Sequence, residues 1–314
     1  MSRKSPYQAT DSTRQHSDKG RTMKVYVMTD MEGVAGVMNF HEWTSHGTPY
    51  YDMAKEFLTL EVNAAVDGLV AGGATDIHVV DAHGPGGINV KLLDPRVTVS
   101  RGWSDPVWPL LLDASYDFVV WVGQHPKAGT EYGHLCHTQG INYLDESING
   151  VSIGEFGELA MCASELGVRA IFASGDCAFT KEAQALVPGI ETVAVKWGVK
   201  PGTGNDMTEE QYGRFTGSAR HMHPTRARSL IREGALRAIQ RAQRESFGII
   251  PLAPPFTRVV KLRPSKDRPK ATMAVMKHPT SLIGVMNTWS EFKPIAGKAK
   301  AKKAAPKAKR TQRR

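Results

Sequence analysis

Two acidic side chains follow the first apolar run of this 314-residue sequence. Asp30 and Glu32 lie in the stretch TDMEGVAG, which comes directly after the run MKVYVM. Two carboxylates one residue apart in extended chain point to the same side and repel each other. A divalent cation beside the pair would remove this repulsion, although a lone Asp-x-Glu pattern is more common in turns and helix caps. Gly33 and Gly36 would let the chain turn sharply there.

Histidines and a third acid follow at other points of the chain. His83 and His125 each come just after an apolar run, His134 and His137 lie a short distance further on, and Glu155 lies near a glycine at the start of a helical pattern. Neutral imidazoles together with carboxylates suit zinc, and they also suit cobalt or manganese. One carboxylate shared by two cations would make a two-metal site, in which ions roughly 4 Å apart polarise a carbonyl and activate a water.

The segments that precede these residues have the pattern of buried parallel strands. Each is short, rich in β-branched or aromatic residues, and bounded by glycine or a polar residue. These segments are 24–28, 76–81, 118–123, 170–176 and 191–196, and helical patterns lie between most of them at 51–73, 157–167 and 180–187. The alternation predicts an α/β fold with a mainly parallel sheet flanked by helices. Ligands of such sheets bind beyond the carboxyl ends of the strands, so the acids and imidazoles should meet at one edge.

The pattern changes after residue 200. Residues 199–222 are glycine-rich and polar and resemble an insertion, and 225–245 predict an amphipathic helix with an exposed basic face. We expect four regions, the last parts forming a smaller C-terminal α+β portion. They are a disordered N-terminal extension (1–22), an α/β metal-binding catalytic domain (23–200), an insertion with the amphipathic helix and the small α+β portion (201–292), and a disordered Lys/Arg-rich tail (293–314).

The net charge of +9 belongs to the ends of the chain, because residues 293–314 hold ten Lys/Arg and no acid. This tail could contact polyanions without sequence preference, or it could be solvated and have no partner. The three cysteines are far apart and form no C-x-x-C pattern, which fits a reducing cytoplasm and excludes a thiolate zinc site. No apolar run reaches the roughly 18 residues of a membrane helix, and the N-terminus has no secretory apolar core. We therefore expect a cytoplasmic protein without membrane contact.

Several motifs together resemble the D-aminopeptidase (DppA) family, the M55 metallopeptidases. The stretches VMTDMEGVAGV, VGQHPKAGT and HTQGINYLDESINGVSIGEFGELAM occur in the family order between about residues 24 and 199, and the match resumes at HPTRARSLIREGALRAI. The resemblance implies a binuclear zinc aminopeptidase, with two zinc ions per subunit, that acts on short peptides with an N-terminal D-residue. It also implies a homo-oligomer in the form of a self-compartmentalising ring of ten subunits.

The resemblance also implies a role for each site residue. The metal ligands it implies are Asp30, Glu32, His83, His125 and Glu155. In the family pattern Asp30 bridges the ions, Glu32 and His83 bind one of them, and His125 and Glu155 bind the other. His137 matches the family's catalytic histidine. We favour His137 over His134 because its separation of 18 residues from Glu155 suits the family spacing.

Other functions remain open at this point. The motifs would bind metals equally well in another metal-dependent amidohydrolase or esterase on the same scaffold. A polyanion-binding protein that acts through its basic tail is a second alternative. A phosphatase-like two-metal hydrolase is disfavoured, because no phosphate-binding loop or arginine clamp is apparent. The chain departs from the family at Thr29, Gln124 and Cys136, and none of these is an implied ligand.

Overall fold

The structure, a computed structural model, describes residues 22–295. The disordered extension expected over 1–22 and the Lys/Arg-rich tail expected over 293–314 therefore fall almost wholly outside the described residues. Within them, no helix combines the length and the apolar character needed to cross a membrane.

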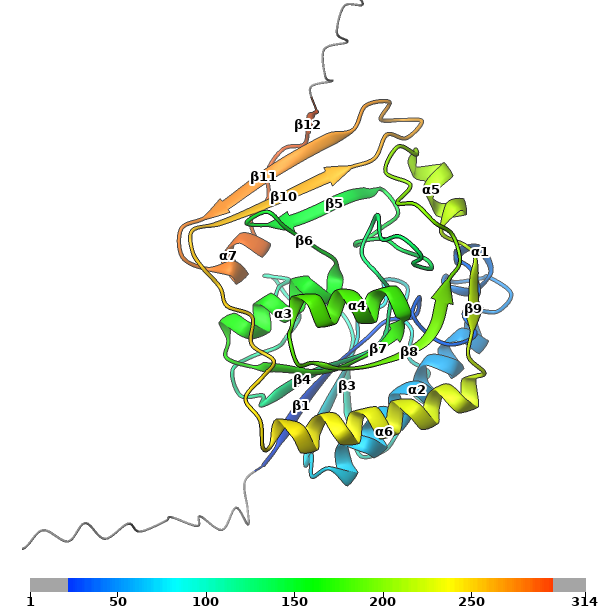
Figure 1. The fold of residues 1–314 in the computed structure, drawn as a ribbon, viewed down its shortest axis with the longest axis vertical. Coiled ribbons are helices and arrows are strands. Elements are labelled where there is room, and N and C mark those ends of the chain that lie inside the picture. The colour runs from blue at the N-terminus through cyan, green and yellow to red at the C-terminus, as the bar shows by residue number, and fades with distance from the viewer. Residues whose placement is uncertain (1–21, 296–314) are drawn as a thin grey trace, which may run out of the picture.

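The larger of the two sheets has seven strands in the order β3-β2-β1-β4-β7-β8-β9 (Figure 1). All neighbours are parallel except β8 and β9. The strands are β1 (Lys24–Thr29), β2 (Asp76–Asp81), β3 (Thr98–Ser100), β4 (Phe118–Gln124), β7 (Arg169–Asp176), β8 (Glu191–Gly198) and β9 (Ala219–His221). The five strands expected from the sequence agree with β1, β2, β4, β7 and β8 to within two residues, and the α/β fold with a mainly parallel sheet is confirmed.

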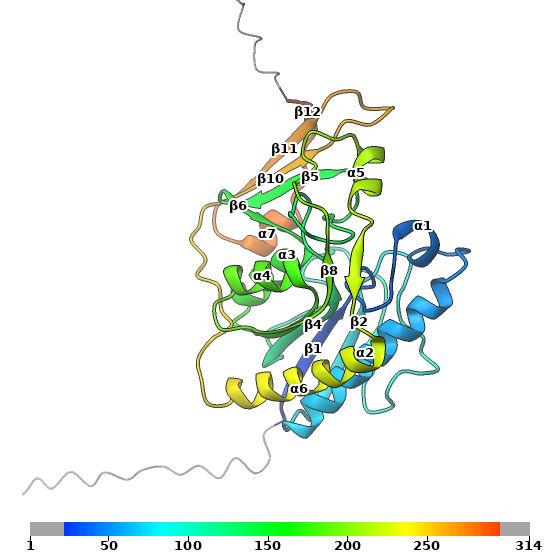
Figure 2. The same ribbon diagram turned by 45° about the vertical axis from the view of Figure 1, so that its right-hand side comes forward.

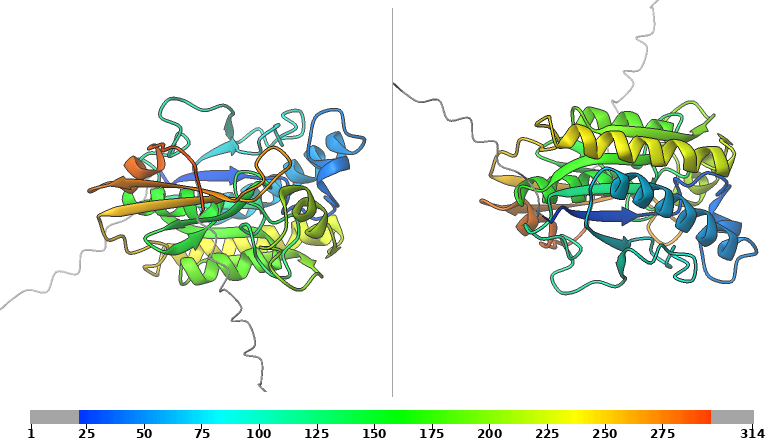
Figure 3. Two further views of the ribbon diagram at one scale, coloured as in Figure 1. Left: turned by 90° about the horizontal axis from the view of Figure 1, so that it is seen from above. Right: turned by 90° about the horizontal axis from the view of Figure 1, so that it is seen from below.

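Helices cover both faces of this sheet. The helices α2 (Tyr51–Ala71) and α6 (Pro224–Ala242) lie side by side across one face (Figure 3). A Cβ at Gly68 would lie 2.2 Å from the carbonyl oxygen of Arg232, so this glycine allows α2 and α6 to pack closely. The helices α3 (Glu155–Glu165) and α4 (Cys177–Leu186) cover the other face (Figure 2). Two apolar cores fill the spaces on the two sides of the sheet.

A second, antiparallel sheet lies on the far side of α3 and α4 (Figure 2). Its strands are β5 (Tyr143–Ile148), β6 (Val151–Ile153), β10 (Phe256–Leu262), β11 (Thr272–His278) and β12 (Lys293–Pro294), in the order β12-β11-β10-β5-β6. Segments from before and after residue 200 thus share one sheet, and the boundary expected there does not separate two sheets. The strand β12 occupies the first two residues of the expected tail.

The expected insertion at 199–222 contains regular structure. The helix α5 (Glu209–Phe215) begins with a capping box formed by Thr208 and Gln211, and β9 extends the main sheet at its edge. Two short helices, α1 (Phe40–Trp43) and α7 (Leu282–Met286), complete the described fold. The end of this segment is tied to the turn after β1, because the Gly36 N–H donates to His221 Nδ1 at 3.1 Å.

Glycines bring the ends of β1 and β4 into direct backbone contact. A Cβ at Gly33 would lie 2.0 Å from the carbonyl oxygen of Gln124, and a Cβ at Gly123 would lie 2.0 Å from that of Asp30. The Gly33 N–H donates to the Gly123 carbonyl oxygen at 2.7 Å. Gly36, with φ +96°, makes the turn expected there, whereas Gly33 serves the close approach of the two strand ends. This approach carries Asp30 and Glu32 toward the end of β4.

Candidate metal centre

Six side chains form two adjoining groups at the carboxyl ends of the parallel strands. Asp30, Glu32 and His83 make the first group, and His125, His137 and Glu155 make the second. Within each group, one potential ligand atom from every residue lies within 4.8 Å of the others. The structure thus brings together all five expected ligands and the expected catalytic histidine. Glu155 is the first residue of α3, so a helix and not the end of a parallel strand supplies it.

The first group is centred on one nitrogen of His83. Its Nδ1 lies 3.2 Å from Oδ1 of Asp30 and 3.0 Å from Oε2 of Glu32. The other nitrogen, Nε2, lies 2.8 Å from the carbonyl oxygen of Thr44, and only an N–H can donate to a carbonyl. The neutral ring therefore carries its proton on Nε2 and turns the Nδ1 lone pair toward the two carboxylates. All three side chains of the group are buried.

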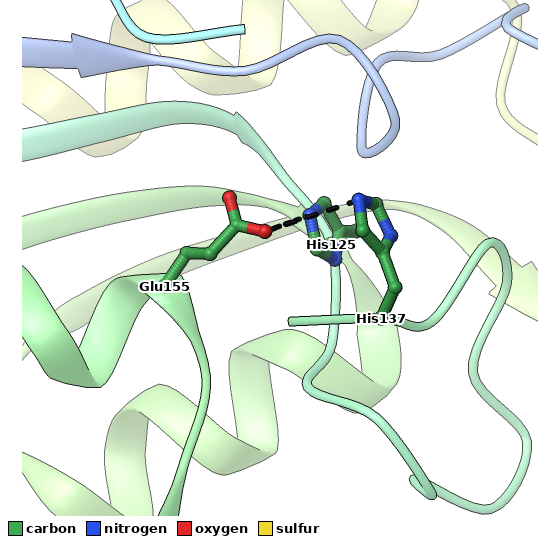
Figure 4. A group of neighbouring side chains, drawn as sticks. All are labelled: His125, His137 and Glu155. Carbon is green, nitrogen blue, oxygen red and sulfur yellow. Dashed lines mark ion pairs between the residues drawn. The ribbon is translucent and has the colours of Figure 1, made fainter. Parts of the chain in front are cut away.

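The second group contains two stacked imidazoles. The rings of His125 and His137 lie 3.8 Å apart between centroids and 10° from parallel. Each donates Nδ1–H to a backbone carbonyl, His125 to Pro126 at 2.9 Å and His137 to Leu135 at 2.8 Å. Both Nε2 atoms face the same Glu155 oxygen, at 3.5 Å from His125 and 3.8 Å from His137 (Figure 4). Backbone contacts of this kind fix the tautomer of metal-binding histidines.

The Asp30 carboxylate joins the two groups. Its Oδ1 lies 3.2 Å from His83 Nδ1, and its Oδ2 lies 3.0 Å from His125 Nε2. The Asp30 oxygens also accept hydrogen bonds from the Met31 N–H at 2.8 Å and from Gln124 Nε2 at 3.0 Å. These bonds orient the carboxylate so that one oxygen faces each group, which is the arrangement of a bridging ligand.

Two buried atoms test whether the site fits a metal. Glu32 Oε2 and His125 Nε2 have no hydrogen-bond partner. Glu32 Oε2 lies 3.0 Å from His83 Nδ1, and His125 Nε2 lies 3.0 Å from Oδ2 of Asp30. Buried polar atoms without partners are rare in proteins, and a bound ion can satisfy them. The donor set of three imidazoles and three carboxylates is the chemistry that zinc prefers. The residues therefore fit zinc, and the same donor set also suits cobalt or manganese.

The histidines of the site differ in their electrostatic state. Burial favours the neutral imidazole, but Glu32 and Asp30 outweigh it at His83, and Glu155 and Asp30 outweigh it at His125, so both pKa values are raised well above the usual range. The pKa of His137 is instead lowered, by burial and by the neighbouring His125. Burial and His125 thus favour the neutral form of the His137 ring, whose Nε2 does not carry the proton that Nδ1 donates to Leu135.

The competing histidine lies outside the metal groups. His134 is buried beside the loop after β1, where its Nε2 donates to the carbonyl oxygen of Met38 at 3.0 Å and its ring contacts that of His221. Burial lowers its pKa far below the usual range. Cys177, for which the sequence offers no catalytic partner, lines a separate cavity of about 610 Å³.

Two residues support the site although no sequence motif marks them. The Gln139 backbone N–H donates to Glu155 Oε1 at 2.7 Å, and its side-chain Nε2 donates to Glu158 at 2.7 Å. Gln139 adopts φ +59°, which is uncommon outside glycine. The fully buried Lys196 donates to the carbonyl oxygens of Glu32 and Val37 at 2.6 and 3.1 Å. In the sequence, the only sign of the role of Lys196 is that a lysine ends the apolar strand expected at 191–196.

Replacing Gln139 by alanine is expected to weaken metal binding at the second group. The side chain anchors the loop whose N–H holds Glu155, and loss of such a supporting hydrogen bond commonly lowers metal affinity about 10- to 100-fold. Zinc affinity measured by competition with a chromophoric chelator checks this. Gln184→Ala is the matched control, because Gln184 forms a similar bond to Thr192 on the exposed side of α4. Equal zinc affinity in both variants would show that Gln139 does not position Glu155.

A cavity of about 420 Å³ opens over both metal groups. Its wall includes Asp30, Glu32, His83, His137 and Glu155. The loop between β3 and β4, the segment after α7 and Arg258 of the second sheet complete the wall. The cavity volume falls within the range of roughly 300–1,000 Å³ that is typical of pockets for small ligands.

Comparisons with known proteins find similarity to D-aminopeptidases. A family model described as D-aminopeptidase (peptidase M55) matches residues 23–281. The D-aminopeptidase of Bacillus subtilis (strain 168) is 27% identical over 195 residues, which is 62% of this chain and 70% of the relative. A solved structure, the Zn-dependent D-aminopeptidase DppA from Bacillus subtilis, described as a self-compartmentalizing protease, matches with a TM-score of 0.71 at 20% identity. That match covers 84% of this chain and 95% of the other and supports the fold.

Proposed function

Because this chain belongs to the M55 D-aminopeptidase family and is a metallo-aminopeptidase, we propose that it is a binuclear zinc enzyme that removes an N-terminal D-amino acid from short peptides. The observation that carries the binuclear assignment is the Asp30 carboxylate, whose two oxygens face two separate imidazole groups. The D-selectivity is inferred from the family to which the chain belongs.

The chain's own residues would hold each of the two ions with one glutamate, one histidine and the shared Asp30. Glu32 and His83 would complete one site, and His125 and Glu155 would complete the other, with Asp30 shared between them. Zinc bound there would polarise the scissile carbonyl and lower the pKa of a bound water. Cobalt or manganese would supply similar chemistry from the same ligands.

His137 is the residue that we propose moves a proton. Its Nδ1–H is fixed on the Leu135 carbonyl, so Nε2 is the atom that can exchange a proton, and this side chain lines the cavity. With Nδ1–H held in this way, the neutral ring can accept a proton at Nε2 during attack on the carbonyl. The same Nε2 would then donate this proton to the amine that leaves. His137 Nε2 lies 3.8 Å from Oε1 of Glu155, so it is beside the second metal group.

The proposal extends to assembly and surroundings. We infer a homo-oligomer, because the matched solved structure is described as self-compartmentalizing. The ring of ten subunits, the cytoplasmic location and the contact of the basic tail with polyanions stay predictions, and the tail lies outside the described residues. Within residues 22–295, the cavity size suits short peptides as substrates.

Metal analysis combined with a stereochemical assay tests the proposed function. We expect about two zinc ions per chain, loss of activity on chelation and recovery on addition of zinc. We also expect hydrolysis of D-aminoacyl amides in preference to their L-forms. Full activity after metal removal would refute the metal mechanism, one ion per chain would refute the binuclear site, and equal D and L rates would refute the stereochemical preference alone.

A further inference from the structure

We propose that Trp103, Asp105 and Trp289 form the subsite for the substrate's N-terminal residue, with Asp105 binding the α-ammonium group and the two indoles contacting the side chain. This inference rests on the proposed function, and it specifies the substrate as a peptide with a free amino end and a large apolar first side chain. All three residues line the 420 Å³ cavity that contains the metal groups.

Asp105 is the acidic residue of the cavity wall that belongs to neither metal group. Four acidic residues line the cavity, and three of them, Asp30, Glu32 and Glu155, belong to the metal groups. Asp105 is the remaining acid, its side chain is exposed, and among residues 22–295 it forms no ion pair with a lysine or arginine. A carboxylate that lines an active-site cavity without a basic partner is available to a cationic group of the substrate. The protonated amino end of a peptide is such a group.

The one basic side chain in the described wall of the cavity is already engaged. Arg258 is 2% exposed, and it donates to Glu146 from Nε at 2.7 Å and from Nη2 at 3.3 Å. Its Nη1 donates to the carbonyl oxygen of Met286 at 3.0 Å. All three nitrogens of the Arg258 guanidinium group are therefore engaged, and no pair of them is left to bind a substrate carboxylate. The charges of the wall favour the amino end of a peptide over its carboxyl end.

Indole rings line the same cavity. Three of the chain's six tryptophans line it: Trp108 is buried, whereas Trp103 is 44% exposed and Trp289 is 73% exposed. Trp289 has the highest exposure among the large hydrophobic side chains in the described part of the chain. Exposed aromatic surface beside a polar site is suited to bury an apolar ligand group. Covering these rings would stabilise a substrate with a large apolar first side chain.

The two sides of this subsite are fixed to each other. The Trp108 N–H donates to Asn287 Oδ1 at 3.0 Å, and Asn287 Nδ2 donates back to the Trp108 carbonyl oxygen at 3.0 Å. This reciprocal pair ties the loop that carries Trp103 and Asp105 to the segment that carries Trp289. The two segments that carry the carboxylate and the indoles are thus joined before a substrate arrives, which lowers the entropic cost of binding.

Asp105→Asn tests the ammonium site. With zinc-loaded enzyme and an aminoacyl p-nitroanilide, we expect KM to rise about tenfold while kcat and zinc content are unchanged, because a charge-assisted hydrogen bond is lost. The desamino analogue, which lacks the ammonium group, should react equally with wild type and variant. Asp267→Asn, at an exposed acid outside the cavity, should leave all these values unchanged.

The outcomes separate this inference from the function on which it rests. An active wild type whose KM is not raised by Asp105→Asn overturns the inference alone, as does an equal loss with the desamino analogue. A zinc-loaded wild type that hydrolyses no free-amino peptide overturns the proposed function and this inference together.

Trp289→Ala tests the side-chain contact. We expect the preference of the enzyme for a phenylalanyl over an alanyl substrate, measured as a ratio of kcat/KM values, to fall about three- to tenfold. Tyr132→Ala is the control, because Tyr132 is a similarly exposed aromatic residue that lines the other cavity. An unchanged preference in Trp289→Ala overturns the assignment of the indoles.

Discussion

Replacing Asp30 by alanine is expected to remove both metal ions from the protein and to abolish peptide hydrolysis. The oxygens of the Asp30 carboxylate face both metal groups, at 3.2 Å from His83 and 3.0 Å from His125. Without it, the remaining imidazoles and carboxylates have no single residue that links them. We expect kcat/KM to fall by more than about 10³-fold, since loss of even one group that stabilises a transition state commonly costs about 10²–10³.

The matched comparison is Glu32→Ala, which removes a carboxylate from the first group only. Zinc content determined by atomic emission after gel filtration should fall toward zero in Asp30→Ala and toward one ion per chain in Glu32→Ala. Circular dichroism and thermal unfolding would show whether each variant is folded. A folded Asp30→Ala protein that retains its full zinc content would disprove the bridging role.

The second large effect is expected for His137→Ala, which should lower kcat about 10²- to 10⁴-fold, the usual range for a general acid or base. The reason is that His137 lines the cavity and holds Nδ1–H on the Leu135 carbonyl, which leaves Nε2 as the atom that can exchange a proton. Zinc content should stay at the wild-type level, because Asp30, His125 and Glu155 still hold the second ion.

His137 also lies within ligand distance of the second group, so the experiment separates two roles. Loss of one zinc ion from His137→Ala would identify it as a ligand rather than a proton-transfer residue. His41→Ala is the control, because His41 is exposed on α1 and lies in neither metal group. A normal kcat in His137→Ala with intact zinc content would remove His137 from the mechanism.

The parallel sheet could be predicted from the sequence because each of its central strands is a short, continuous apolar run. The strands β1 and β4 are buried along almost their whole lengths, so their residues need no polar face. Parallel order also places every carboxyl end at one edge. The meeting of Asp30, His83 and His125 therefore followed from the expected fold before any distance was known.

The second sheet could not be predicted in the same way. Its strand β5 carries Asp145 and Glu146 side by side, so its sequence lacks the apolar pattern by which a strand is predicted. Lys261 and Arg258 on β10 pair with these acids at 2.9 and 2.7 Å, and those partners lie more than 100 residues later in the chain. The sequence around each acid contains no sign of its distant partner. Gln139 and Asp105 escaped prediction for a related reason, since their surroundings come from remote segments.

The tie between Trp108 and Asn287 can form only late in the synthesis of the protein. All expected metal ligands have been synthesised once the chain reaches Glu155. Asn287 and Trp289 are among the last described residues to be synthesised. The nascent chain thus possesses its ligands more than 100 residues before it possesses the wall that completes the cavity. Synthesis delivers the residues that bind the metals first and the complete substrate pocket last.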